Sequence, residues 1–423
     1  MIQNNNIPQG YKDSSLGIIP EEWEVKRLGE ICKVNQGLQI PISERLKKYE
    51  PNSYKYITIQ YLNNAKEEEY IKNPNKSVIC SYEDVLMTRT GNTGIVIHDV
   101  EGVFHNNFFK IDYNRKFANK LFLIEFLRQR KTQHLILIKA GASTIPDLNH
   151  KDFYSICILL PPLPEQQKIA EILTVWDNAI DIQTRLIASL QKRKRGLMQQ
   201  LLTGKKRVHQ FHELTRKEIS ENSCNSWTEW ETVELGDILD YEQPTPYLVS
   251  STLYNDKYTI PVLTAGKTFI LGYTDEINGV YENIPVIIFD DFTTDTKFVD
   301  FPFKAKSSAM KILKTKENVN IIYVYAAMQQ IKYAIGGHER HWISKYAYLT
   351  IPLPPLAEQT AIANIFSSAD KEIDLGKKKL ASLKAQKKGL MQQLLTGKKR
   401  VHQFHELTRK EISENSCNSW IKK

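Results

Sequence analysis

Two stretches of this 423-residue sequence are rich in polar and basic side chains of the types that contact nucleic acids. The candidates in the first stretch are Thr88, Arg89, Thr90, Asn92, Thr93, Lys110, Ser143 and Thr144, and those in the second are Thr264, Lys267, Thr293, Thr294, Lys297, Lys304, Lys306, Ser307, His338, Arg340 and His341. Arginine and lysine donate to guanine, asparagine pairs with adenine, and serine and threonine bind base edges or phosphates. Loops of many proteins carry such residues, so only the set as a whole favours the reading of DNA.

Motifs for catalysis are scarce. The sequence contains no G-x-x-x-x-G-K-[ST] phosphate loop, no G-x-G-x-x-G after a strand and no (N/D)PP(Y/F) tetrad of an adenine methyltransferase. Asp290 and Asp291 end an apolar run, but no further carboxylate or lysine follows at the spacing of a nuclease site. His209 and His212 have no cysteine or third ligand nearby at a zinc-binding spacing. The sequence therefore predicts a non-catalytic chain without a metal or cofactor of its own.

Composition limits the class of protein. The net charge of +9 and a pI near 9.0 suit a polyanionic partner. Hydrophobic residues make up 41%, enough for packed cores, and the length favours more than one domain. We find neither a signal peptide nor an apolar run of about 18 residues. Five widely spaced cysteines indicate no disulfide framework, so we expect a soluble cytoplasmic protein with reduced thiols.

An internal repeat organises the chain. The same 32 residues occur at 196–227 and at 389–420, an offset of 193. At this offset "PPLPEQ" (161–166) aligns with "PPLAEQ" (354–359). The alignment continues from these motifs to the identical segments without a gap. A weaker match at an offset of 207 aligns Trp23 and the "LGEI" that follows it with Trp230 and "LGDI". The chain therefore reads as a duplication that carries two different variable blocks.

Each repeat contains one long predicted helix. The seam residues are Ile169, Leu173, Trp176, Ile180, Ile187, Leu190, Leu197 and Leu201 in the first copy, and Ile362, Phe366, Ala369, Ile373, Leu380, Leu383, Leu390 and Leu394 in the second. This heptad spacing predicts coiled-coil helices over 165–202 and 358–395 that pair with each other in antiparallel fashion. Lys194 and Lys387 interrupt the seam at matching places, and polar residues there fix register.

The variable blocks are predicted to be mixed α/β. Strand patterns include residues 54–62 and 284–292, and helical patterns include 119–140 and 319–335. The predicted fold class is α+β, with two such domains separated by two long helices in a pseudo-two-fold duplication. The expected parts are a first domain at 1–160, a spacer helix at 161–203, a linker at 204–227, a second domain at 228–353, a second spacer helix at 354–397 and a tail at 398–423.

The whole pattern resembles the specificity subunit of Type I restriction–modification systems. The resemblance rests on the doubled "(I/L)xLPPLxEQ" motif, on "GLMQQLLTGKKR", and on the "W…LG(E/D)I" start of each block. It implies two target recognition domains that each contact one half of an asymmetric, split DNA site. It also implies two modification subunits with a methyltransferase that uses S-adenosylmethionine, and restriction subunits that use ATP and Mg²⁺. One departure is Ala357, which stands where the first copy has Pro164.

Two other classes of function compete with this interpretation. A fused nuclease or methyltransferase would need the catalytic motifs that the sequence lacks. A coiled-coil scaffold would need only the helices, and salt-dependent binding to duplex DNA separates it from a DNA reader.

Overall fold

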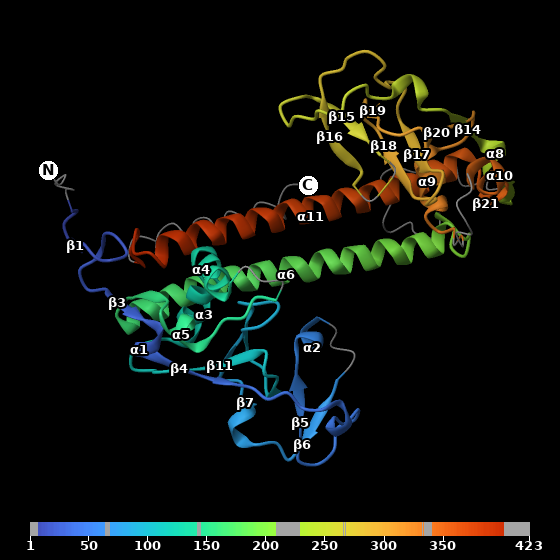
Figure 1. The fold of residues 1–423 in the computed structure, drawn as a ribbon. Helices are drawn as coiled ribbons and strands as arrows, with labels where there is room; N and C mark the ends of the chain where they lie inside the picture. Colours follow the sequence, from blue (N-terminus) through green and yellow to red (C-terminus); the bar gives the residue numbers. More distant parts are fainter. Residues whose placement is uncertain are drawn as a thin grey trace. The chain divides into compact units, whose positions relative to one another are not determined.

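The computed structural model describes residues 7–63, 68–141, 145–208, 229–264, 266, 268–331, 333 and 341–401 (Figure 1). The chain divides into two compact units. The first comprises Met1–Gln183 with Lys379–Lys423, and the second comprises Thr184–Lys378. Because both boundaries fall inside long helices, each unit contains the first half of one long helix and the second half of the other.

The two long helices predicted from the heptad spacing are present. Helix α6 spans Leu163–Leu201 and helix α11 spans Leu356–Leu394. Both begin directly after a proline pair, where a missing backbone N–H costs little. No helix in the described ranges has an apolar stretch long enough to cross a membrane.

Ion pairs along the helices set their register. In the first unit Lys387 Nζ lies 2.7 Å from Asp177 Oδ2, and in the second Lys194 Nζ lies 2.6 Å from Asp370 Oδ1. In each unit, residues near the start of one helix thus face residues near the end of the other, so the segments run antiparallel, as predicted. The two lysines that interrupt the seam are the residues that make these pairs.

The first unit contains two four-stranded sheets. Its strands are β1 Tyr11–Lys12, β2 Ile19–Pro20, β3 Glu24–Arg27, β4 Cys32–Gln36, β5 Ser53–Ile57, β6 Tyr70–Lys72, β7 Ile79–Cys80, β8 Val85–Thr88, β9 Val96–His98, β10 Gly102–Phe104, β11 Phe108–Tyr113 and β12 Cys157–Leu160. One sheet has the order β4-β11-β8-β9 and is antiparallel; the other has the order β6-β5-β10-β7, with β5 and β10 parallel.

Short helices cover the core of the first unit. They are α1 Leu28–Ile31, α2 Ile59–Asn63, α3 Lys120–Arg128, α4 Arg130–Ala140 and α5 His150–Tyr154. Asn119 caps the start of helix α3, and its side chain accepts hydrogen bonds from the N–H groups of Leu121 and Phe122. Its buried residues pack with Ile169 and Leu173 of α6 and with Leu394 of α11 in one hydrophobic cluster. Both long helices therefore contribute to the core of this unit.

The second unit repeats this order of elements. Its strands are β13 Glu231–Glu234, β14 Leu239–Glu242, β15 Ile260–Leu263, β16 Ile270–Thr274, β17 Val286–Asp290, β18 Thr296–Val299, β19 Lys304–Ala305, β20 Met310–Thr315 and β21 Thr350–Leu353, and its short helices are α8 Leu235–Ile238, α9 Ile321–Met328 and α10 His341–Ser344. The sheet orders are β14-β20-β17-β18 and β16-β15-β19, with β15 and β19 parallel. Each sheet matches one in the first unit strand for strand, apart from the edge strand β7.

One predicted strand is wrong in its second half. Residues 54–62 were expected to form a single strand, but the chain turns after Ile57 into helix α2. Parallel pairing of β5 with β10 ends at Ile57, whose carbonyl accepts from the His105 N–H at 3.0 Å. Thr58 Oγ1 then accepts the Tyr61 N–H at 3.0 Å and starts the helical turn.

A tryptophan, a glutamate and an arginine close each unit in the same way. In the first unit Glu165, in the first turn of α6, accepts from the Trp23 indole at 3.0 Å and from Arg400 Nε at 2.7 Å. The equivalent contacts in the second unit, which all involve the glutamate at the start of α11, are Trp230 Nε1 to Glu358 at 2.9 Å and Arg207 Nε to Glu358 at 2.8 Å. We call these contacts the closing triads. The tryptophans and glutamates are visible in the sequence as matching residues of the two repeats, but only the fold brings them to one site.

Candidate nucleic-acid interface

The turn between β8 and β9 contains most of the candidates in the first unit. Thr88 is fully buried, and its Oγ1 donates to the Asn92 carbonyl and accepts the Ile95 N–H at 2.8 Å. Thr93 is buried as well, with Oγ1 3.0 Å from the Pro146 carbonyl oxygen. Both hydroxyls are used inside the turn. The DNA contacts predicted for these two threonines therefore do not fit their positions, because the turn needs the same donors for its own backbone.

Arg89 ties this turn to the segment before α5. Its Nη2 donates to Asp147 Oδ2 at 2.7 Å, and its guanidinium carbon lies 5.3 Å from the centroid of the Phe109 ring. Thr90 Oγ1 donates to the other oxygen of the same carboxylate. Only 14% of the Arg89 side chain is exposed. In this arrangement Arg89 and Thr90 hold the shape of the turn, and Asp147 competes with any base for the guanidinium.

The remaining candidates of the first unit differ in exposure. Asn92 is exposed at the tip of the turn. Lys110 is half-buried in β11, with Nζ donating to the Ile79 carbonyl at 3.0 Å and lying 5.9 Å from the centroid of the Phe104 ring. Ser143 and Thr144 lie outside the described residues.

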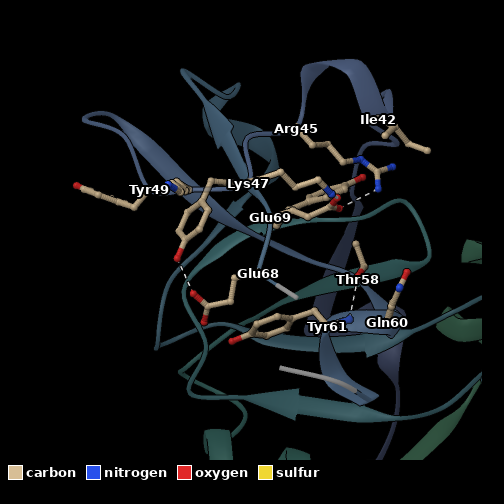
Figure 2. Close-up of a pocket in the computed structure, with 12 residues that line it drawn as sticks. Ile42, Arg45, Lys47, Tyr49, Thr58, Gln60, Tyr61, Glu68 and Glu69 are labelled. Atoms are coloured by element: carbon tan, nitrogen blue, oxygen red, sulfur yellow. Dashed lines mark hydrogen bonds and ion pairs between the residues drawn. The ribbon is translucent and has the colours of Figure 1, made fainter. Parts of the chain in front are cut away.

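A cavity of about 700 Å³ opens beside α2 (Figure 2). Its lining comes from the segment after β4, from β5 and α2, and from the residues just before and at the start of β6. These residues are Ile42, Arg45, Lys47, Lys48, Tyr49, Tyr56, Thr58, Gln60, Tyr61, Glu68, Glu69 and Tyr70. None of these residues was among the candidates from the sequence. The sequence did not predict this cavity, because residues 54–62 alternate between apolar and polar as in a strand. A strand would place Gln60 and Tyr61 on opposite faces of a sheet.

Hydrogen bonds and ion pairs join the residues in the wall of this cavity. Arg45 donates to the Ile40 carbonyl and to Glu69, and its guanidinium carbon lies 5.0 Å from the centroid of the Tyr56 ring. Burial opposes ionisation of Glu69, but hydrogen bonds from Lys47 and Arg45 outweigh it and lower the pKa of this carboxyl. The wall therefore carries carboxylates at neutral pH.

The second unit has an equivalent turn between β17 and β18. Asp290 Oδ1 accepts the N–H groups of Phe292 and Thr293 at 2.9 and 3.2 Å. Thr294 has a φ of 58°, a left-handed conformation that a turn requires here. Thr293 is exposed, while Thr294 and Lys297 are half-buried. The turn thus presents threonine hydroxyls at the place where the first unit presents Asn92.

Lys304 lies inside the second unit. Its Nζ donates to the Asn278 carbonyl at 2.6 Å and lies 3.0 Å from Glu276 Oε2, and the residue is 3% exposed. Hydrogen bonds from the Ser250 backbone N–H and from Lys304 hold the pKa of Glu276 at about 2. The burial of Lys304 does not fit the predicted DNA contact, because its charge is already neutralised by a carboxylate that stays ionised.

Other candidates of the second unit stay near the surface. Lys306 is exposed, and Thr264 and Ser307 are half-buried. Ser307 Oγ accepts the Ala309 N–H at 3.1 Å, so its hydroxyl proton is still available to a ligand. Lys267, His338 and Arg340 lie outside the described residues.

His341 belongs to a buried polar group rather than to the surface. His341, Asp291 and Lys311 are each at most 1% exposed, and Lys311 Nζ lies 3.4 Å from Asp291 Oδ2. Asp291 also accepts the Trp342 N–H at 2.9 Å and thereby holds the start of α10. Direct contact of His341 with DNA, expected from the sequence, does not fit this burial. In the described part of the chain, no group of three or more His, Cys, Asp or Glu residues is placed to hold a metal ion.

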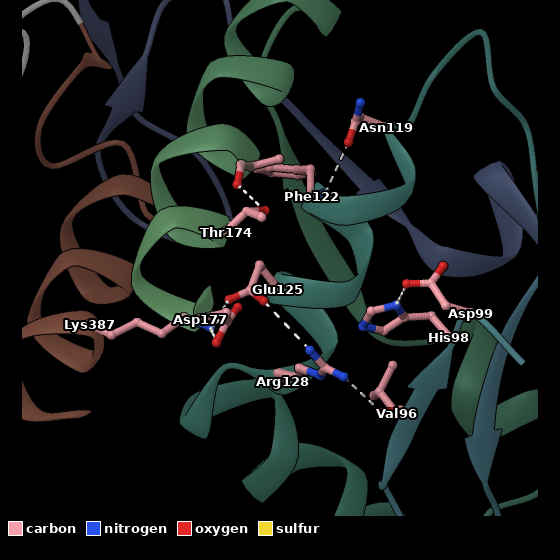
Figure 3. A network of polar contacts seen from close by, with 11 residues as sticks. Val96, His98, Asp99, Asn119, Phe122, Glu125, Arg128, Thr174, Asp177 and Lys387 are labelled. Atoms are coloured by element: carbon pink, nitrogen blue, oxygen red, sulfur yellow. Dashed lines mark hydrogen bonds and ion pairs between the residues drawn. The ribbon is translucent and has the colours of Figure 1, made fainter. Parts of the chain in front are cut away.

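A polar network joins helix α3 of the first unit to both long helices (Figure 3). Lys387 Nζ lies 2.7 Å from Glu125 Oε2 and 2.7 Å from Asp177 Oδ2. Glu125 belongs to α3, so the network connects that helix to α6 and α11. Burial raises the pKa of Glu125, with the nearby Lys387 acting in the opposite direction. The network fixes α3 to the two long helices of its own unit.

Comparison with known proteins identifies the family. The model of the Type I restriction modification DNA specificity domain matches residues 20–192 and 228–385, which together are more than half of the chain. The two matched ranges correspond to the two copies of the duplication.

Individual relatives agree with this match. The chain is 55% identical to the Type I restriction enzyme EcoR124I/EcoR124II specificity subunit of Escherichia coli over 132 residues, which are 30% of this chain and 33% of that subunit. It is 26% identical to the Type I restriction enzyme MjaVIII specificity subunit of Methanocaldococcus jannaschii, over 93% of this chain and 98% of that one. A crystal structure of the Type-I restriction-modification system S subunit from M. genitalium has the same fold, with a TM-score of 0.60 at 15% identity, covering 93% of this chain and 98% of that one. The chain therefore belongs to the family of Type I restriction–modification DNA specificity subunits.

Proposed function

We propose that the chain reads an asymmetric DNA sequence in two separated halves, one half for each compact unit. As a specificity subunit it is itself non-catalytic and works in a complex with modification and restriction subunits. The two closing triads carry the proposal, because they join two different recognition folds to the two long helices in the same way. A chain that repeats the contacts between domain and helices, but changes the surface of the domain, is suited to reading two different sequences.

We assign the DNA-contacting surface to the exposed members of the candidate set. In the first unit these are Asn92 and the half-buried Lys110. In the second unit these are Thr293 and Lys306, with the half-buried Lys297. Ser143, Thr144, Lys267, His338 and Arg340 stay in the proposal on residue type alone. Lysines supply phosphate contacts, and asparagine and threonine supply contacts to bases.

Membership of the family supports the following partners. Two modification subunits would dock on the two long helices, and restriction subunits would complete the complex. S-adenosylmethionine would bind to the modification subunits, and ATP with Mg²⁺ to the restriction subunits. We place the domain limits at 1–160 and 228–353 for the recognition domains and at 161–203 and 354–397 for the spacer helices, with 204–227 and 398–423 as the repeated linker and tail.

The long helices set the gap between the two halves of the DNA site. Inserting seven residues after Ser189 and seven after Ser382, which are equivalent positions, keeps the heptad phase in both helices. Each helix grows by about 10 Å, which corresponds to about three base pairs. Mapping of methylated adenines should then show an unchanged pair of half-sites with a wider gap.

A matched variant tests the phase argument. Two-residue insertions at the same positions rotate the apolar seam out of register and should abolish site-specific methylation. If the seven-residue variant methylates the original site with the original gap, the helices do not set the spacing. If the assembled wild-type complex binds unrelated duplexes as well as its own site at every salt concentration, the chain is a scaffold rather than a reader.

A further inference from the structure

The hairpin that begins with β5 has a counterpart in the second unit. Strand β5 pairs with β6 in antiparallel fashion and with β10 in parallel fashion, and β15 pairs with β16 and β19 in the same two ways. The connection between the hairpin strands is therefore equivalent in the two units. In the second unit this connection carries Thr264 and Lys267, which residue type alone assigned to DNA. In the first unit it begins with α2.

Helix α2 has a different neighbour on each of two sides. A Cβ atom built on Gly91 would lie 4.0 Å from Ile59 Cδ1, so α2 lies next to the turn between β8 and β9. On its other side Gln60 and Tyr61 line the cavity described above (Figure 2). The turn and the cavity are thus neighbours with α2 between them. Helix α2 therefore lies between the predicted reading turn and an open polar pocket.

The cavity has the chemistry of a site for base edges. Gln60 is exposed, and a side-chain amide donates and accepts in the pattern that matches adenine. Tyr61 adds a phenol that donates and accepts and an aromatic face. Glu68 and Glu69 line the same cavity with lowered pKa values, Glu68 chiefly through its hydrogen bond from Lys55 and Glu69 through Lys47 and Arg45 despite its burial. Their negative charge disfavours a phosphate inside the cavity.

The side chains suited to phosphate contacts lie at the edge of the cavity. The Lys47 side chain is 74% exposed at the cavity, and Lys48 is exposed beside it. Arg45, in contrast, is held by the Ile40 carbonyl and Glu69 and supports the wall. The site thus has neutral polar groups next to the turn and exposed lysines at its edge, of which Lys47 pairs with Glu69 at 2.7 Å. A base edge with its flanking phosphates requires this distribution.

We propose that α2 is a base-reading element of the first recognition unit. Gln60 and Tyr61 bind base edges of duplex DNA at the mouth of the cavity, and Lys47 and Lys48 contact the flanking phosphates. The proposal rests on the DNA-reading function above and assigns part of it to residues that no sequence motif marks. Arg89 supports the neighbouring turn and acts through it.

The test uses the chain assembled with its modification subunits. Methylation is measured in competition between the wild-type site and duplexes with one base pair changed at each position of either half-site. Gln60→Ala and Tyr61→Phe should lower discrimination about tenfold or more at one or two positions of a single half-site. Discrimination in the other half-site should stay unchanged. Gln60→Glu should change the preferred base at the same position, since a carboxylate accepts but does not donate.

Control variants distinguish a loss of base discrimination from a loss of stability and from a loss of sequence-independent binding to DNA. Tyr82→Phe alters a tyrosine of the same unit that is exposed outside the cavity and should leave discrimination intact. Lys47→Gln and Lys48→Gln should weaken binding to all sequences alike and reduce its salt dependence. Thermal unfolding of the Gln60 and Tyr61 variants should match that of the wild type.

Two results would overturn the assignment. One is full discrimination at every position by both Gln60→Ala and Tyr61→Phe. The other is an equal loss at all positions of both half-sites, which would make α2 a phosphate contact. Failure of the DNA-reading function itself has a different signature, since the wild-type complex would then discriminate at no position.

Discussion

Arg400 binds Glu165 through two nitrogen atoms, Nε at 2.7 Å and Nη2 at 3.0 Å, although the residues are 235 positions apart. The same pair in the second unit is Arg207 with Glu358, at 2.8 and 2.6 Å. Each arginine follows the long helix of one copy and binds the glutamate that starts the long helix of the other copy. The repeated "GKKR" segment therefore completes the unit that contains the other copy's recognition domain.

Arg400→Ala should destabilise the first unit alone. The Arg400 and Glu165 side chains are 20% and 12% exposed, so the loss should lie between that of a surface pair and that of a buried one, about 1–3 kcal/mol. Amide hydrogen exchange in α3 reports on the first unit and exchange in α9 on the second. Arg207→Ala is the matched variant and should show the reverse pattern. Equal protection losses in both units after either substitution would argue against two independent closures.

Lys387→Met should be more harmful than Lys194→Met. Lys387 lies 2.7 Å from both Glu125 and Asp177, and its loss leaves the buried Glu125 with the more distant Arg128, 3.9 Å away, at a cost of about 3 kcal/mol. Lys194 contacts Asp370, which is well exposed, and the residue at the place of Glu125 in α9 is Ala326. Urea unfolding of both variants measures the difference. Similar losses would mean that Glu125 does not depend on Lys387.

Glu125 should make stability depend on pH. Burial raises the pKa of Glu125 in the folded state, so the folded chain holds this proton at pH values where the unfolded chain has released it. The stability contributed by Glu125 is therefore present below its ordinary pKa of about 4.3 and decreases as pH rises through the folded value. Glu125→Gln removes this dependence.

The measurement is the difference in unfolding free energy between the wild type and Glu125→Gln from about pH 4 to pH 8. The wild type should lose stability relative to the variant as pH rises, and the difference should then become constant. A difference that moves in the other direction would show that Lys387 lowers the pKa of Glu125 below its ordinary value.

Arg89→Ala and Asp147→Asn should have the same effect on DNA reading. Both substitutions remove the ion pair that joins the turn after β8 to the segment before α5. We expect each to reduce discrimination in one half-site, because the turn lies next to α2. Competition methylation with single-base variants of the site measures the loss. If Arg89→Ala loses a guanine preference that Asp147→Asn retains, Arg89 contacts that base directly.

The sequence by itself determined the long helices and their pairing. Heptad spacing is a local property, because the apolar pattern recurs every seven residues along the chain. Two copies of this pattern predict two equivalent helices. Lys194 and Lys387 were recognisable as residues that set register, because a charge in an apolar seam must find a partner. The family followed from the same repeated motifs, since they recur with a fixed offset and need no folded structure to be read.

Tertiary structure decided which polar residues are available to DNA. Thr88, Lys304 and His341 have side chains typical of a binding surface, yet each is buried by partners that the sequence does not place beside it. Lys304 meets Glu276 only because β19 pairs with β15, whose hairpin partner β16 ends just before that glutamate. Helix α2 could not be predicted from the sequence, because the alternating pattern of residues 54–62 does not show where the strand ends. Where it stops depends on β10, which lies 45 residues further along the chain, and pairing between distant strands is set by the fold rather than by local residue preference.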